Sequence, residues 1–373
     1  MRNEMREQIQ TLLKKVSGRM MELNSDGIRE KYPVSLIDMK CWEWPQGIGL
    51  YGLYRYCEKT GEKEVLDYLI NWYDERISEG IHEKNVNTTS PMLTLTYLYE
   101  KTGNQKYLSL IKEWTEWIMD ENGLIRTGDG CFQHMITGDP NQGEILIDTL
   151  FMAVLFLARA GRILNREDCL KEADYQFLKH IQYLYNRKTG LFFHGWNFDG
   201  MHNYGEVQWG RGNSWYTIGI MEYLEERKEN DSLCRYFIGI YQNQVRALKK
   251  YQDKESGLWH SVINNPRTYI EASASAAFLA GIMKGIRLDV LGKAEFERLI
   301  AAGVPGLIRC IAPDGTVEHV SYGTPIGEDE EFYNSIPCCA MTYGQALTIL
   351  MLSELLEDYW SDAYETTDFL RTV

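Results

Sequence analysis

A helical repeat constrains this chain more than any other feature of its sequence. The segment LYRYCEKTGEKEVL, residues 53–66, lines up with LTYLYEKTGNQKYL, residues 95–108. In each copy an apolar helix ends at Lys-Thr-Gly, where glycine can take the left-handed conformation that closes a helix, and an amphipathic helix follows after a short turn. The chain is therefore expected to stack αα-hairpins side by side.

The same alternation continues along the chain. Apolar helices are expected near residues 49–59, 90–101, 146–160, 212–226, 272–286 and 341–357. Amphipathic helices are expected near residues 4–22, 63–77, 106–120, 168–185, 232–251 and 293–310. Short extended pieces, such as residues 191–194 and 258–260, indicate small β-hairpins in the loops at one end. Six inner and six outer helices predict an all-α (α/α)6 barrel, a toroid, as one domain over residues 1–373.

Composition narrows the classes of function. No apolar run approaches the roughly 18 residues that cross a bilayer, and the opening MRNEMREQIQ is no secretory signal, so we expect a cytoplasmic protein that does not enter membranes. The formal net charge of −14 disfavours nucleic acid as a partner. The eight cysteines lack zinc-type spacing, so buried thiols in a reducing compartment and no metal are expected. The 10 Trp and 24 Tyr suit a sugar ligand, although aromatic side chains more often fill cores.

One acidic residue stands out because of its surroundings. Asp148 lies within ILIDTLFMAVLFL, residues 145–157, where Thr149 is the only other polar residue. Burial disfavours the charged form, so the sequence predicts a raised pKa for Asp148 and a general acid that keeps its proton near neutral pH. The alternative is structural, because Asp148 could be the N-cap of the helix that the run forms. The three apolar residues before it favour the first interpretation.

The segments that lead into the inner helices of such a barrel converge on one mouth. They are rich in aromatic and polar residues: WEWPQG (42–47), NVNTTSP (85–91), EILID (144–148), VQWGRGN (207–213), TYIEAS (268–273) and FYNSIP (332–337). Polar and aromatic groups gathered in a concavity are typical of a ligand site.

Several of these segments resemble a known family, the unsaturated glucuronyl and rhamnogalacturonyl hydrolases of glycoside hydrolase families 88 and 105, with the second closer. The resemblance covers nearly the whole chain and rests on WEWPQG, the Asp148 helix, FHGW (193–196), WGRGNSW (209–215) and YQDKESGLW (251–259). It implies an (α/α)6 barrel that removes a 4,5-unsaturated uronic acid from the non-reducing end of oligosaccharides left by polysaccharide lyases. It implies neither a metal nor an organic cofactor.

The resemblance also implies roles for individual residues. Asp148 matches the family's aspartic acid, which protonates C4 of the vinyl ether and steers water to C5, after which the hemiketal opens and releases the aglycone. His194 resembles the family's binding histidine. Many relatives carry a second aspartate where this chain has Asn87, which cannot ionise but can still donate a hydrogen bond to the sugar.

Further residues are candidates for contacts with the substrate. Arg211 has a planar fork that matches a carboxylate, and a surface or helix-end arginine is the alternative. Trp209 and Trp215 need not share a helix face, so one is expected to stack on the sugar and the other to pack in the core. The remaining candidates are His134, Trp42, Trp44 and Tyr333.

Two other functions remain open from the sequence. A two-carboxylate glycosidase or a sugar epimerase on the same barrel would need Glu271 or Glu144 to act with Asp148 or a histidine. A carbohydrate-binding protein with a decayed catalytic site would bind without turnover, with Asn87 as the sign of the loss. The hydration needs one acid/base, which favours the hydrolase.

Overall fold

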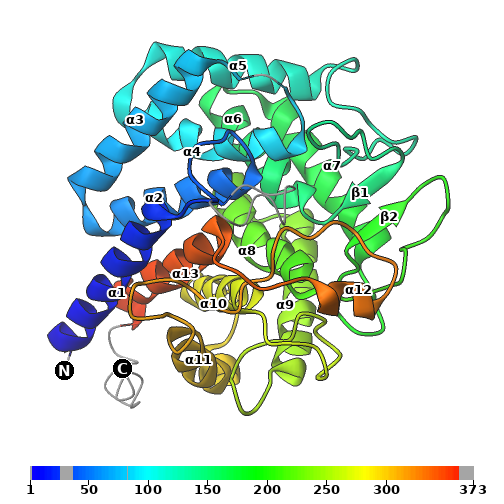
Figure 1. Cartoon of the computed structure of the whole chain (residues 1–373). Coiled ribbons are helices and arrows are strands. Elements are labelled where there is room, and N and C mark those ends of the chain that lie inside the picture. Colours follow the sequence, from blue (N-terminus) through cyan, green and yellow to red (C-terminus); the bar gives the residue numbers. More distant parts are fainter. Residues whose placement is uncertain (1, 26–36, 82, 361–373) are drawn as a thin grey trace.

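The apolar helices of the repeat form the inner ring of the molecule. The computed structural model describes residues 2–25, 37–81 and 83–360. Each inner helix packs against the next, and the last packs against the first, so the ring is closed (Figure 1). The inner helices are α2 (Trp44–Thr60), α4 (Val86–Thr102), α6 (Leu155–Ile163), α8 (Gly210–Arg227), α10 (Ala272–Arg287) and α13 (Thr342–Leu355).

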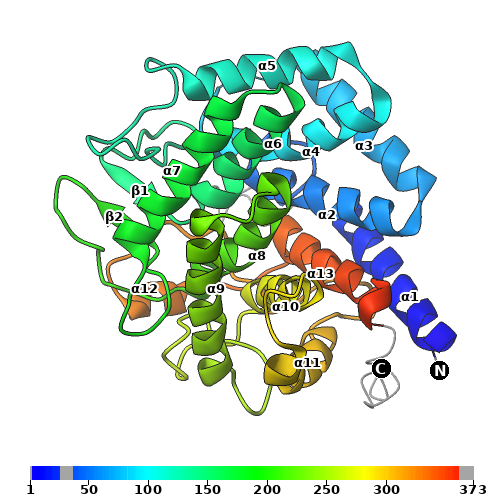
Figure 2. The same cartoon turned by 180° about the vertical axis from the view of Figure 1, so that it is seen from behind.

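The amphipathic helices form the outer ring. Helices α3, α5, α7, α9 and α11 each pack on the inner helix that precedes them, and α1 packs against α13 and α2 (Figure 2). Their bounds are α1 (Arg2–Glu22), α3 (Lys63–Glu79), α5 (Gln105–Met119), α7 (Glu167–Leu184), α9 (Ser232–Tyr251) and α11 (Lys293–Ile308). The predicted (α/α)6 barrel is therefore confirmed.

The two Lys-Thr-Gly sequences end inner helices in the predicted way. Gly61 closes α2 at φ 74°, and Gly103 closes α4 at φ 66°, both in the left-handed region. Their N–H groups donate to the main-chain oxygens of Cys57 and Tyr99. Glycine reaches this conformation without the clash that a Cβ would cause, so the chain can turn sharply into the outer helix.

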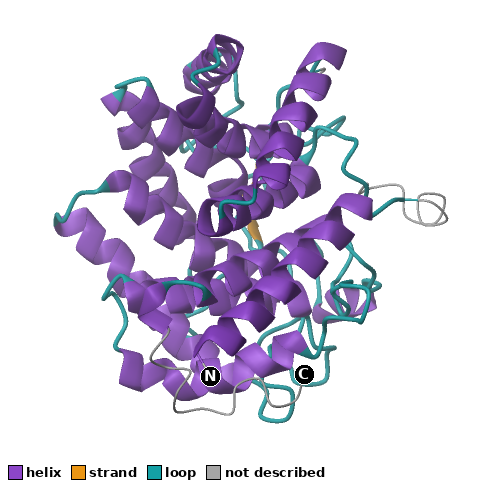
Figure 3. Ribbon diagram, turned by 90° about the vertical axis from the view of Figure 1, so that its left-hand side faces the viewer, coloured by secondary structure: helices purple, strands orange, loops and turns teal. Residues whose placement is uncertain are grey.

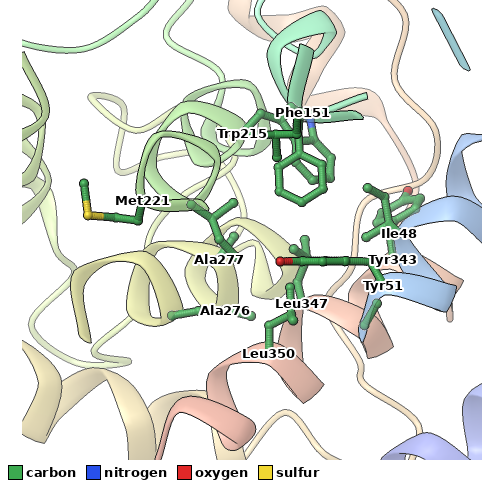
Figure 4. Close-up of a cluster of buried hydrophobic side chains, with 14 of the residues drawn as sticks. Ile48, Tyr51, Phe151, Trp215, Met221, Ala276, Ala277, Tyr343, Leu347 and Leu350 are labelled. Carbon is green, nitrogen blue, oxygen red and sulfur yellow. The ribbon is translucent and has the colours of Figure 1, made fainter. Parts of the chain in front are cut away.

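The barrel interior is filled with side chains from all sides of the ring. Phe151 and Trp215 lie with ring centroids 5.3 Å apart, and Tyr343 and Leu347 approach them from α13 (Figure 4). Close packing between inner helices needs small residues, and Gly281 of α10 is one: a Cβ there would lie 2.7 Å from the main-chain oxygen of Thr217 in α8. The centre of the ring is thus a packed core.

The β-structure is limited to short pieces in the loops (Figure 3). Strands β1 (Glu144–Leu146) and β2 (Gly195–Asn197) pair antiparallel, with Ile145 opposite Trp196. They belong to different loops, so this pair is not a hairpin. The predicted hairpins are reduced to single bridges within loops, such as Tyr185 with Phe192, and His260 with Ile270.

The segment around Asp148 differs from the sequence prediction. Of the apolar residues before it, Ile145 and Leu146 belong to β1 and Ile147 lies in a turn, and the helix begins later with the π-helical turn η1 (Leu150–Val154), which continues into α6. Tyr333 also lies elsewhere than expected. It belongs to a separate short helix, α12 (Glu330–Ser335), and not to the start of the sixth inner helix; η2 (Asp358–Trp360) ends the described chain. No helix in the described ranges is apolar and long enough to cross a membrane.

Candidate active site

The N-terminal ends of the inner helices meet at one mouth of the barrel. Each inner helix is followed by an outer helix that returns, so the inner helices all run in the same direction. Side chains at their first turns touch: the Trp44 ring of α2 stacks on Tyr343 of α13 at 4.7 Å, and Arg211 of α8 lies 3.6 Å from Glu271 before α10. The segments that the sequence predicted to converge do converge.

Asp148 lies at this mouth, in the turn between β1 and η1. The N–H of Ile147 donates to the main-chain oxygen of His194, which brings the β2 loop to the carboxylate. The Asp148 main-chain oxygen accepts from the N–H groups of Phe151 and Met152, but its side chain accepts no hydrogen bond from the described residues. The N-cap alternative is therefore wrong. With 15% of its side chain exposed, Asp148 remains within reach of a substrate.

Two histidines flank this carboxylate. His194 Nε2 is 3.4 Å from Asp148 Oδ2, an electrostatic contact without hydrogen-bond geometry. Burial raises the pKa of the Asp148 carboxyl, but His194, His134 and Arg211 together lower it by more, so the net pKa lies below its ordinary value. The predicted raised pKa is wrong in direction, because the apolar run did not reveal these partners.

His134 is held as a neutral ring. Its Nδ1 lies 2.8 Å from the hydroxyl oxygen of Thr149, and its side chain is buried. Burial lowers the pKa of His134 to about 4, more than the neighbouring Asp148 raises it. At neutral pH this histidine is a hydrogen-bonding group without charge.

His194 is enclosed on its other sides. Its ring lies over Trp209, with centroids 4.3 Å apart, and its Nδ1 is 2.7 Å from the hydroxyl oxygen of Tyr333. The Tyr333 hydroxyl also accepts the N–H of Gly327 at 3.0 Å. Tyr333 is 1% exposed and Trp209 is 2% exposed, so both contact His194 and neither lines open space in this structure.

Arg211 is buried, which excludes the surface alternative, although it does lie at a helix end as the second residue of α8. Its guanidinium lies between the rings of Trp209 and Tyr343, at 4.6 and 4.7 Å from their centroids. Only 1% of the residue is exposed, and the carboxylate of Glu271 faces it. The positive charge is therefore largely compensated inside the protein.

The fork of Arg211 is occupied by the segment 321–324. Nη1 donates to the main-chain oxygen of Ser321 at 3.1 Å, and Nη2 donates to Tyr322 O at 3.1 Å and to the Thr324 hydroxyl at 3.0 Å. These bonds hold a loop at the mouth. A bidentate contact between Arg211 and a substrate carboxylate remains a prediction, and it would have to replace some of them.

Glu271 is not available as a second catalytic acid in this geometry. It is the N-cap of α10, is fully buried, and accepts from the N–H of Ala274 at 2.6 Å. Its other oxygen accepts from the Ser273 hydroxyl and from the N–H of Ser321. A carboxylate that is saturated with donors and closed to solvent serves structure, which weakens the two-carboxylate alternative.

The remaining candidates divide between the mouth and the core. Asn87 is half-buried in the first turn of α4, and its amide forms no hydrogen bond with the described residues. Trp42 and Trp44 are also half-buried, and Trp42 Nε1 donates to the main-chain oxygen of Thr88 at 2.8 Å. Trp215 is fully buried, so it packs in the core. Asn87, Trp42 and Trp44 thus keep surface that a ligand could touch.

Sequence reasoning missed two residues of the mouth. Tyr343 stacks on both Trp44 and Arg211, and Glu43 is the N-cap of α2. Burial raises the pKa of Glu43, and a hydrogen bond from the Thr137 hydroxyl offsets part of this effect. The available signal for Glu43 was an acid directly before Trp-Pro at a helix start. Within the described chain no three His, Cys, Asp or Glu side chains gather as metal ligands would.

Comparisons with known proteins agree with this architecture. The model of the family described as Glycosyl Hydrolase Family 88 matches residues 12–359. The Unsaturated rhamnogalacturonyl hydrolase YesR of Bacillus subtilis is 30% identical over 321 residues, which cover 85% of this chain and 90% of that protein. A crystal structure from Klebsiella pneumoniae, described as a possible member of the GH105 family, superposes with a TM-score of 0.89 at 39% identity and covers 95% of this chain and 94% of the other. A protein from Salmonella enterica serovar Paratyphi A, described in the same words, gives a TM-score of 0.90 at 40% identity, with 95% of each chain covered.

Proposed function

Because this chain belongs to glycosyl hydrolase family 88 and is a glycoside hydrolase, we propose that it removes a 4,5-unsaturated uronic acid from the non-reducing end of an oligosaccharide. The reaction is a hydration of the C4=C5 double bond, with Asp148 as the general acid and base. The name of the Bacillus relative favours rhamnogalacturonan-derived disaccharides as the first substrates to test.

The observation that carries this proposal is that Asp148 remains accessible while Glu271, an expected partner for two-carboxylate chemistry, is closed to solvent. Ordinary glycoside hydrolysis needs two carboxyl groups on either side of the glycosidic oxygen. Here Glu271 is buried against Arg211, while Asp148 keeps 15% of its side chain exposed beside His194. The accessible carboxyl group of Asp148 suits a reaction in which the same residue gives a proton to carbon and takes one from water.

The proton balance of the reaction closes on Asp148 alone. The protonated carboxyl transfers its proton to C4, and positive charge develops at C5 and the ring oxygen. Water then forms a bond to C5, and the carboxylate of Asp148 accepts the proton that this water loses. The resulting hemiketal at C5 opens, and the bond to the aglycone breaks. Asp148 ends the cycle protonated, as it began.

The low pKa of Asp148 in the free protein requires a change on binding. The substrate brings its own carboxylate and displaces water from the mouth, and both effects disfavour a charged Asp148. The acidic form that the hydration needs is therefore produced in the complex. This coupling replaces the permanently raised pKa that the apolar run predicted.

A substrate carboxylate would meet a favourable field at this mouth. The six inner helices direct their N-terminal ends toward it, and each such end carries a partial positive charge. Asn87 and the two flanking histidines, His134 and His194, add hydrogen-bonding groups without adding a negative charge. We propose that these groups, with Trp42 and Trp44 as aromatic platforms, hold the sugar, and that Arg211 acts mainly by fixing the 321–324 segment.

Two further expectations belong to this proposal. We place the protein in the cytoplasm, because all eight cysteines are free, as a reducing compartment would keep them; Cys338 is exposed, unlike the buried thiols expected. We also treat the chain as one catalytic domain, because its first and last inner helices, α2 and α13, pack against each other.

The test is the loss of ultraviolet absorbance of the conjugated double bond in lyase-generated disaccharides. Asp148→Asn removes the transferable proton without changing the shape of the side chain, and we expect the rate to fall by at least about 100-fold. The matched control is Asp199→Asn, at an exposed aspartate after β2, which should keep full activity. Full activity in Asp148→Asn would overturn the proposal. Turnover of saturated substrates would favour a two-carboxylate glycosidase, and tight binding without turnover by the wild type would favour a carbohydrate-binding protein.

A further inference from the structure

The hydroxyl group of Tyr333 lies between two partners that fix the direction of its proton. The N–H of Gly327 donates to it at 3.0 Å, which occupies one lone pair of the phenol oxygen. His194 Nδ1 lies 2.7 Å from the same oxygen. Burial raises the pKa of Tyr333, so the phenol keeps its proton. Among the described residues, His194 Nδ1 is the acceptor within hydrogen-bond distance of that proton.

The geometry around His194 favours one tautomer of its ring. If Tyr333 donates to Nδ1, the ring proton must be on Nε2. Nε2 faces Asp148 Oδ2 at 3.4 Å, and neither of these two buried atoms has a hydrogen-bond partner in the described chain. The opposite tautomer would point a lone pair at the carboxylate and leave the phenol proton without an acceptor.

We infer that Tyr333 is a positioning residue, which sets His194 in the Nε2–H tautomer and thereby directs one oxygen of Asp148 toward the histidine and the other toward substrate. No contact between Tyr333 and the sugar is required, which agrees with its 1% exposure. The catalytic consequence rests on the proposed function, whereas the tautomer itself does not. Tyr333 was expected to contact the substrate, and this inference gives it a different role.

The neighbours of Asp148 explain why the tautomer matters for its charge. The charged or titratable groups that act on this carboxyl are His194 from the β2 loop, His134, Arg211 from α8 and Tyr333 from α12. His134 is neutral, and Arg211 is compensated by Glu271. The Nε2–H group of His194 is thus the closest dipole that favours the ionised form, and reversing it would favour the protonated form.

Tyr333→Phe isolates this effect, because it removes the hydroxyl and keeps the ring that packs 5.7 Å from His194 and 5.8 Å from Trp209. We expect kcat to fall by roughly tenfold or more, since a misoriented histidine no longer holds Asp148. We also expect the pH profile of kcat/KM to move up by about one unit, because the carboxylate loses a favourable donor. A role in packing alone would leave the pH profile in place.

The matched control is Tyr269→Phe. Tyr269 donates its hydroxyl proton to the main-chain oxygen of Tyr333 at 3.3 Å, so this variant removes a phenol from the same neighbourhood without touching the His194 contact. Its pH profile should equal that of the wild type. If both variants shift the profile equally, the effect comes from the packing of α12 and the inference fails.

A direct readout comes from nitrogen NMR of protein labelled at histidine, with His194→Gln used to assign the resonance. In the wild type at neutral pH, His194 should show a protonated Nε2 and an unprotonated Nδ1, and Tyr333→Phe should move it toward the other tautomer. A protonated Nδ1 in the wild type would overturn the inference even if no variant folds. An Nε2–H tautomer in a protein that leaves every unsaturated uronate intact would instead refute the proposed function and leave the positioning role standing.

Discussion

At the scale of single residues, the mouth is organised around a carboxylate that is ionised before substrate arrives. The pKa of Asp148 is lowered although burial acts to raise it, because His194, His134 and Arg211 outweigh burial. The carboxyl group that we propose gives a proton to carbon is therefore unprotonated in most free molecules at neutral pH. On this proposal, we expect proton uptake to accompany substrate binding.

The pH dependence of the reaction should reveal this uptake. Above the lowered pKa, the protonated fraction of free Asp148 falls tenfold per pH unit, so kcat/KM should decrease as pH rises from about 5 to 8. The value of kcat should hold to a higher pH, because the carboxylate of the bound substrate raises the pKa of Asp148 in the complex. The measurement is chromophore loss at each pH, at substrate concentrations well below KM and well above KM. A kcat/KM that rises with pH across this range would contradict it.

The contribution of Asp148 to the stability of the fold sets the lowest pH at which that experiment can be done. A depressed carboxyl pKa stabilises the folded state above the ordinary pKa of the unfolded chain, and this contribution is lost as pH falls through the folded pKa. Rates below about pH 4 would therefore mix catalysis with acid unfolding, and circular dichroism at each pH separates the two.

How far the site could be read from sequence follows from which of its contacts are local. Asp148 stands out within its own run, so the sequence alone singles it out as the candidate acid, and its catalytic role stays a prediction. The charge state of Asp148 depends on His194, which the pairing of β1 with β2 brings near. The charge of Arg211 is likewise compensated by Glu271, which comes from another segment of the chain. Such partners have no signature in a single sequence. The direction of the pKa shift of Asp148 and the hydrogen bonds that already occupy the guanidinium of Arg211 were therefore not predictable.

At the scale of helices, the inner ring depends on places where two backbones approach closely. Gly281 faces the main-chain oxygen of Thr217 at the contact between α10 and α8, with no room for a methyl group. Gly239, in the outer helix α9, faces open space. The same residue type thus has opposite consequences in the two rings.

Alanine at these two positions should change stability in opposite directions. Gly281→Ala should lower the free energy of unfolding by about 1–3 kcal/mol, because the added methyl group forces α8 and α10 apart. Gly239→Ala should raise it by about 0.5–1 kcal/mol, because alanine favours the helix. Urea denaturation followed by circular dichroism measures both, and a stabilised Gly281→Ala would show that the ring is not tightly packed there.

Helices were predicted well because their signals are local. Apolar and amphipathic periodicity, together with the glycine caps at Gly61 and Gly103, placed each helix of the two rings within a few residues. The exception is the start of the Asp148 segment, residues 145–147, which was expected to belong to a helix or its entry and is partly strand. A short apolar run fits either structure, and the choice was made by a strand partner from another loop.

At the scale of the whole molecule, the end of the barrel away from Asp148 is closed by charged side chains. At the far end, charged side chains from α2, α8 and α10 meet inside the ring and leave a cavity of only about 20 Å³. Lys284 Nζ lies 2.8 Å from Glu222, and Glu222 also accepts the Tyr51 hydroxyl at 2.7 Å. Burial raises the pKa of Glu222, but Lys284 and Arg55 lower it to about 2.

Removing one partner of the Lys284–Glu222 ion pair should lower the free energy of unfolding strongly. Lys284→Met leaves the Glu222 charge buried without its partner, and we expect the free energy of unfolding to fall by about 3–5 kcal/mol. Adding Glu222→Gln should recover much of the loss, because the uncompensated charge is gone. The control is Lys63→Met, at an exposed ion pair with Asp67, which should lower the free energy of unfolding far less than Lys284→Met does. Equal losses in the single and double variants would contradict the argument.

The stacking of Trp44 on Tyr343 has a consequence for how the enzyme is made. The other neighbouring helices of the ring follow one another closely along the chain and can pair while synthesis proceeds, but this contact joins the first inner helix to the last. A nascent chain therefore carries an open arc with an apolar edge until α13 leaves the ribosome. The same event that hides this edge also places Tyr343 over Arg211, so a chain that stops early cannot bring these mouth residues together.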